Sequence, residues 1–86
     1  MKYTLIMIFI ISNGFCGKVE DMFKKGNEEM VAENYIEAIE VYESILNLGY
    51  ESSELYYNLG NGYFRLELIG NSIWAYMNAL DMAPRD

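Results

Sequence analysis

The sequence predicts an all-α fold in which an N-terminal signal peptide precedes two helix-turn-helix repeats, a solenoid of four antiparallel helices. Three features of the chain predict it: a fixed offset between its two halves, apolar residues at helical spacing, and glycine, serine and proline where helices would start or stop. The pairs related by an offset of 34 residues are Gly26 with Gly60, Asn27 with Asn61, Tyr35 with Ile69, Ala38 with Ser72, Ile39 with Ile73, Tyr42 with Tyr76 and Leu46 with Leu80. A 34-residue period is typical of a stacked helix-turn-helix unit.

Residues 1–16 have the layout of a secretory signal peptide. The positive charge of Lys2 precedes an apolar run that starts at Tyr3, and small and polar residues follow the run. Small side chains at Gly14 and Cys16 favour cleavage after Cys16, with cleavage after Gly14 as the second choice. The apolar run is shorter than the roughly 20 residues that a membrane-spanning helix needs. A disordered tail, or one buried by a partner, is the alternative.

The first repeat, residues 19–52, predicts one helix from Val19 to about Ala32 and a second that begins after Asn34 and stops at Gly49. Asn34 followed by Glu37 resembles a capping box. Glycine costs about 1 kcal/mol of helix propensity relative to alanine, so we expect a close packing contact at Gly26. The expected core positions are Val19, Met22, Phe23, Gly26 and Met30 in the first helix, and Tyr35, Ala38, Ile39, Tyr42, Ile45 and Leu46 in the second.

The second repeat, residues 53–86, predicts a third helix that starts near Ser52 and a fourth that begins around Ile69 and ends before Pro84. The third helix has Tyr56, Leu59, Gly60, Tyr63 and Leu66 on one face, and the fourth presents Ile73, Trp74, Tyr76, Met77 and Leu80. Nothing after the fourth helix is available to cover Trp74 and Met77. We therefore expect these two residues to form an exposed apolar face, which marks a binding surface or a missing element.

The second repeat resembles the tetratricopeptide repeat family at Tyr56, Leu59, Gly60, Tyr63, Tyr76, Ala79 and Pro84, and the first at Gly26, Ala38 and Tyr42. The first repeat departs from the family's preferences at Lys25, Glu29 and Tyr50. The stretch NLGNGYFRLELIGNSIWAYMNALDMAPRD also resembles the repeat region of the Bacteroides aerotolerance-type envelope proteins. These resemblances imply a protein-binding solenoid and, for the narrower one, a membrane-associated complex.

The family resemblance also implies a binding groove, because the first helices of successive repeats line a concave surface in tetratricopeptide proteins. Some members hold the C-terminal carboxylate of a peptide with asparagine and lysine side chains, and Asn27 and Asn58 fall on two asparagine positions of that clamp. Its first lysine position holds Phe23 here. We expect Asn27, Asn58, Asn61 and Arg65 to form hydrogen bonds with the backbone of a bound segment. In the alternative interpretation, Asn27 and Asn61 only brace the turn between helices.

Composition argues against catalysis. The chain has no histidine and a single cysteine, Cys16, so Ser-His and Cys-His nucleophile pairs and His/Cys zinc sites are excluded. We predict no catalytic residues, no metal site and no cofactor. The formal net charge is −7, and all 13 acidic residues follow Gly17. Such a surface repels phosphate backbones, so nucleic acid is not an expected partner.

The expected function is that of a non-catalytic scaffold or adaptor, exported to the periplasm or cell envelope, that binds a partner protein or peptide in its groove. Two repeats are fewer than the three that a solenoid usually needs for stability. The alternatives are a self-associating module, such as a homodimer through the face bearing Trp74, and the N-terminal fragment of a longer repeat protein, since the chain ends after Pro84 where a further helix would start.

Overall fold

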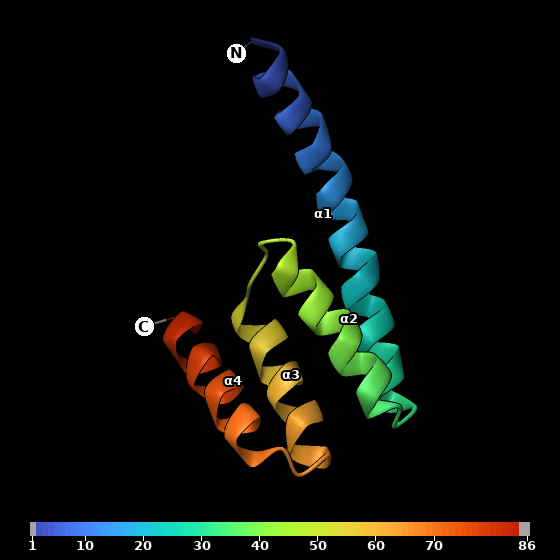
Figure 1. The fold of residues 1–86 in the computed structure, drawn as a ribbon, viewed down its shortest axis with the longest axis vertical. Helices are drawn as coiled ribbons and strands as arrows, with labels where there is room; N and C mark the ends of the chain where they lie inside the picture. Colours follow the sequence, from blue (N-terminus) through green and yellow to red (C-terminus); the bar gives the residue numbers. More distant parts are fainter. Residues whose placement is uncertain (1, 85–86) are drawn as a thin grey trace.

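The computed structural model confirms four helices in two antiparallel hairpins (Figure 1). It describes the backbone of residues 2–84 and the side chains of residues 17–84. Helix α1 spans Lys2–Val31, α2 spans Tyr35–Asn47, α3 spans Ser53–Arg65 and α4 spans Ile69–Met82. Each helix packs against the next one along the chain, and α1 also contacts α3. The hairpins α1–α2 and α3–α4 correspond to the two predicted repeats.

Helix α1 begins far upstream of the predicted start at Val19 and runs beyond the other helices (Figure 1). The predicted signal peptide, residues 1–16, has its side chains outside the described part of the structure, as do both proposed cleavage positions, so it stays a prediction. Among the described residues, no helix combines the length and apolar character required to cross a membrane.

The core lies where α2 and α3 meet between the two hairpins. Its buried residues are Ala38, Ile39, Tyr42 and Ile45 of α2, Leu55, Leu59 and Tyr63 of α3, and Ala75 of α4. Val19, Met22, Phe23 and Met30 of α1 pack against this cluster, as their spacing predicts. In α4 the buried positions are the small residues Ser72, Ala75 and Ala79, and the Ser72 hydroxyl donates to the Gly60 carbonyl oxygen at 3.0 Å.

Three helix ends share one hydrogen-bond pattern, in which the residue after the C-cap has a positive φ. At the end of α2 this residue is Gly49, the predicted stop; its N–H donates to Leu46, and the N–H of Tyr50 donates to Ile45. The equivalent residues after α1 and α3 are Glu33, at φ 64°, and Glu67, at φ 61°. A side chain is disfavoured in this left-handed conformation, so both glutamates hold a strained turn.

The starts of α2, α3 and α4 agree with the sequence in position, but not every predicted capping hydrogen bond forms. Ser52 caps α3, because its hydroxyl accepts a hydrogen bond from the Leu55 N–H at 3.0 Å. Asn34 precedes α2 but its side chain makes no capping hydrogen bond, so the predicted capping box with Glu37 is wrong. The Asn34 amide instead donates to Glu29 at 3.3 Å, since the turn after α1 brings these two side chains together.

Candidate functional site

A glycine, an asparagine and a tyrosine join the two helices of each hairpin in the same way. In the first hairpin, a Cβ at Gly26 would lie 2.5 Å from the Tyr42 ring, so only glycine admits the ring. The Tyr42 hydroxyl then donates to Oδ1 of Asn27 at 2.6 Å. The second hairpin repeats both contacts, with a distance of 2.6 Å between the Gly60 Cβ position and the Tyr76 ring, and 2.6 Å between the Tyr76 hydroxyl and Asn61.

The structure brings Asn27 of α1 and Asn58 of α3 together and gives the other two predicted groove residues, Asn61 and Arg65, separate partners. Asn58 donates from Nδ2 to Oδ1 of Asn27 at 3.1 Å, which connects the first helices of the two repeats. Arg65 lies 4.8 Å from the ring centre of Tyr35, a cation-π contact between the last turn of α3 and the start of α2. The contacts of Asn27 and Asn61 are those expected from the bracing alternative. Asn58 also forms a side-chain hydrogen bond with Tyr42, so it belongs to the same network as Asn27.

The predicted apolar face on α4 is exposed, but its two residues have different surroundings. Trp74 is 49% exposed and its indole packs edge-on against Tyr56, with 5.7 Å between ring centres. Met77 is 60% exposed and lies beside Ile73 and Leu80, which are 53% and 73% exposed. We call Ile73, Met77 and Leu80 the outer face of α4. Sequence analysis singled out Trp74 and Met77 and did not predict the exposure of Ile73 and Leu80, because helical spacing does not say which side α3 covers.

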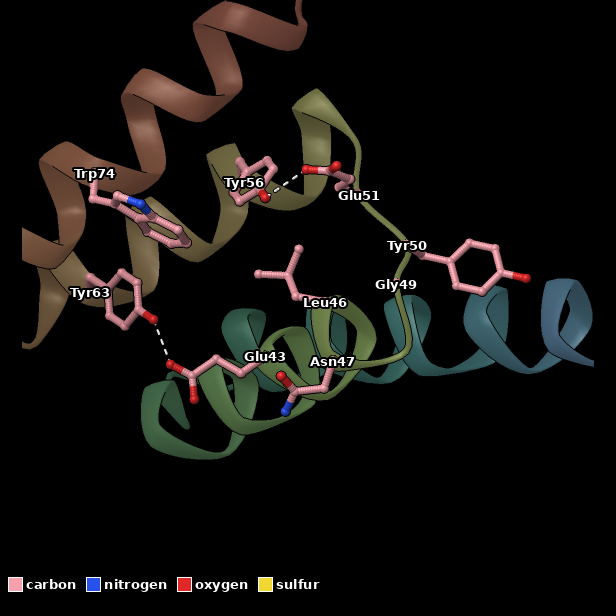
Figure 2. Close-up of a pocket in the computed structure, with 9 residues that line it drawn as sticks. All are labelled: Glu43, Leu46, Asn47, Gly49, Tyr50, Glu51, Tyr56, Tyr63 and Trp74. Atoms are coloured by element: carbon pink, nitrogen blue, oxygen red, sulfur yellow. Dashed lines mark hydrogen bonds between the residues drawn. The ribbon is translucent and has the colours of Figure 1, made fainter.

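Trp74 lines a hollow of about 510 Å³ between α2, α3 and α4, which we call the α2–α4 hollow (Figure 2). Its lining residues are Glu43, Leu46, Asn47, Gly49, Tyr50, Glu51, Tyr56, Tyr63 and Trp74. The Tyr63 hydroxyl donates to Glu43 at 2.5 Å, and the Tyr56 hydroxyl donates to Glu51 at 2.8 Å. The hollow therefore combines aromatic walls with two carboxylates that tyrosines hold in place.

The tyrosines of the α2–α4 hollow are donors throughout the physiological pH range. Burial, reinforced by the neighbouring Glu43 carboxylate, raises the pKa of Tyr63 to about 12. Burial and the hydrogen bond to Glu51 raise the pKa of Tyr56 as well. Sequence analysis placed Tyr56 and Tyr63 on the packed face of the third helix and did not single out Glu43. No sequence signal connects Glu51 to Tyr56, because the extended backbone at Ser52, just before α3, sets their distance.

These surfaces supply groups that suit binding. The described side chains contain no group of three or more acidic or cysteine residues placed to hold a metal ion. The groove residues, the outer face of α4 and the α2–α4 hollow supply hydrogen bonds, apolar surface and fixed negative charge, which are the ingredients of recognition. No protein-family model matches the chain, and a search of curated proteins found no match either. The resemblance to tetratricopeptide proteins accordingly rests on the 34-residue offset and on the residues at its positions.

Proposed function

We propose that the chain is a non-catalytic tetratricopeptide-type module that is exported to the cell envelope, where it binds a partner protein. The export part rests on the signal-peptide pattern of residues 1–16. The binding part rests on one observation: α1 and α4, the first and last helices of the stack, expose different kinds of side chain. The first end carries a polar surface and the last end carries an apolar one.

The difference is visible at equivalent positions of α1 and α3. Leu55, Leu59 and Gly62 of α3 are buried, and a Cβ at Gly62 would lie 3.0 Å from Ile39 of α2. The residues 34 positions earlier in α1 are Asp21, Lys25 and Glu28, and all three are exposed. Polar residues on an outer helix are what a terminal repeat needs for solubility.

Helix α4 exposes apolar residues instead of polar ones on its outer side. Its outer face, Ile73, Met77 and Leu80, is more than half exposed at every position, whereas Ile39, the residue of α2 that corresponds to Ile73, is buried. Contiguous exposed apolar surface on a small protein marks a site of interaction. A partner that covers this face would supply the packing that α3 gives to α2.

Site-specific photo-crosslinking in intact cells tests this assignment on the full chain. A photoreactive residue is placed at position 77 on the outer face of α4, at position 58 in the predicted groove, or at position 28 on the polar face of α1. We expect adducts with another protein from position 77 and none from position 28. Adducts from position 58 alone would move the binding surface to the groove, and adducts from position 28 alone would contradict the proposal.

A matched pair of substitutions connects the crosslink to the apolar surface. Leu80→Glu places a charge on the outer face of α4, whereas Ile36→Glu places the same charge on an exposed aliphatic position of α2. The first substitution should remove the adduct at position 77, and the second should leave it. Cleavage of the signal peptide is checked by determining the N-terminal residue of the protein recovered from the envelope fraction, where a start at Gly17 or Phe15 is expected.

The second candidate is self-association through the same outer face of α4. Head-to-tail stacking of two copies would press the apolar α4 face against the charged Asp21, Lys25 and Glu28 of α1, which removes water from charged groups at an apolar surface. A homodimer would therefore pair α4 with α4. In that case the crosslinked product has twice the mass of the chain, and thermal stability rises with protein concentration.

A further inference from the structure

We propose that the α2–α4 hollow binds the guanidinium group of an arginine side chain on a partner polypeptide. This inference rests on the proposed function only in that the ligand is a polypeptide. The hollow and the outer face of α4 have no residue in common, so either assignment can fail alone.

The side chains around the hollow converge on it from three elements. Figure 2 shows Trp74 of α4 and Glu43 of α2 on facing sides, with Leu46 between them, while the ring of Tyr50 points away. A volume of about 510 Å³ falls within the range of about 300–1,000 Å³ that is usual for ligand pockets. An extended side chain and part of its backbone therefore fit.

The charge of the hollow is negative and uncompensated. Glu43 and Glu51 both line it, and no lysine or arginine is among the lining residues. The ion pair found among residues 17–84, between Lys25 and Glu29, lies on α1 instead. An apolar ligand would remove water from two carboxylates without replacing their hydrogen bonds, which is unfavourable. The hollow thus selects a cation.

The carboxylates are already oriented for such a ligand. Each accepts one hydrogen bond from a tyrosine hydroxyl, Glu43 from Tyr63 and Glu51 from Tyr56. An ionised carboxylate has about four acceptor sites, so most of the capacity of both groups is unused. Because the hydroxyl bonds fix the carboxylates before the ligand arrives, little ordering is required on binding.

The aromatic wall favours arginine over lysine. Trp74 is half exposed and extends into the hollow (Figure 2). A planar guanidinium stacks on aromatic rings, is less strongly hydrated than an ammonium group and presents five donors, so it can pack on Trp74 while it donates to one of the two carboxylates. The chain itself contains the same pairing at its other side, where Arg65 lies over Tyr35.

The intrinsic fluorescence of the full chain provides the test, because Trp74 is its only tryptophan. The probes are N-acetyl-alanyl-arginyl-alanine amide and the two peptides in which lysine or citrulline replaces arginine. Citrulline has nearly the shape of arginine without its charge. We expect a saturable fluorescence change with the arginine peptide, weaker binding of the lysine peptide and no saturable change with the citrulline peptide.

Paired substitutions separate the hollow from the general negative charge of the protein. The Glu43→Gln/Glu51→Gln variant keeps an acceptor for each tyrosine, and loss of charge-assisted hydrogen bonds should weaken the arginine peptide by about tenfold or more. The Glu28→Gln/Asp81→Asn variant makes the same change in net charge at exposed positions outside the hollow, and should bind within about twofold of the wild type, as expected for screened distant charges. Equal binding of the citrulline peptide, or equal weakening in both variants, would overturn the proposal.

Discussion

Ile39 of α2 and Ile73 of α4 occupy the same position in the two repeats, yet Ile39 is 7% exposed and Ile73 is 53% exposed. Both residues are isoleucines at the same place in the second helix of a repeat, so neither helix propensity nor hydrophobicity explains the difference in exposure. The cause is the next helix: α3 lies against Ile39, where Gly62 allows close approach, and no described element lies against Ile73. In a repeat fold the neighbour, and not the repeat itself, decides which residues form the core.

The contacts within each hairpin do not show this difference. Both hairpins contain the same ones. The contact of a tyrosine ring with a glycine and the hydrogen bond to the following asparagine occur in each hairpin at nearly equal distances. Both hairpins also turn through a glutamate with a positive φ. Contacts within a hairpin therefore follow from the repeated sequence, whereas contacts between hairpins depend on position in the stack.

The largest expected difference between the hairpins is that between Ile39→Ala and Ile73→Ala. Ile39→Ala should lower the free energy of unfolding by about 3 kcal/mol, since it opens a cavity in the core. Ile73→Ala should change it by no more than about 0.5 kcal/mol, as for other exposed positions. Urea denaturation of both variants checks the difference. Similar losses in both would mean that another molecule covers α4 in solution.

Gly26→Ala and Gly60→Ala compare the same packing contact at two places. Gly26→Ala should destabilise by about 1 to 2 kcal/mol, because Tyr42 is fully buried and its ring has no room to move; overpacking outweighs the gain in helix propensity. Gly60→Ala should cost half of that or less, since Tyr76 contacts the exposed Tyr57 and can shift outward. Thermal unfolding measures both. A larger loss for Gly60→Ala would contradict the idea that the last hairpin is looser.

Alkaline pH tests the tyrosines at the junction of the two hairpins. Burial raises the pKa of Tyr42 and of Tyr63 to about 12 in the folded protein, compared with about 10 in an unfolded chain. Between pH 10 and pH 12 the unfolded chain loses protons that the folded chain keeps, so stability should fall as pH rises through this window. Melting temperatures from pH 9 to pH 12 check it. The Tyr42→Phe/Tyr63→Phe variant should show a shallower fall, and an unchanged slope would reject this cause.

The smallest expected effects are equal in the two hairpins. Glu33→Gly and Glu67→Gly relieve a side chain in a left-handed conformation, and each should stabilise the fold by about 0.5 to 1 kcal/mol. Equal gains would show that local backbone strain is independent of position in the stack. The measurement is the midpoint of urea unfolding for each variant, with Glu28→Gly, inside α1, as a control that should destabilise.

Sequence reasoning found the helices and most of the core because both depend on spacing along the chain. The 34-residue offset defined the two hairpins, and the glycine at position 26 predicted a close contact before its partner, Tyr42, was known. The capping box at Asn34 and Glu37 was wrong, since a capping sequence does not ensure that the side chain turns back to the helix. The α2–α4 hollow was missed, because its residues come from three helices and a loop.

The sequence by itself determined the number of helices, where they turn and which residue types repeat, since these follow from local preferences and from a period in the chain. Only the tertiary structure decided that Ile39 is core and Ile73 is surface, that Asn27 and Asn61 accept hydrogen bonds from tyrosines, and that Trp74 lines one hollow with Glu43 and Glu51. These features depend on distances between segments far apart in the chain. Such distances are set by packing, which no single stretch of sequence contains.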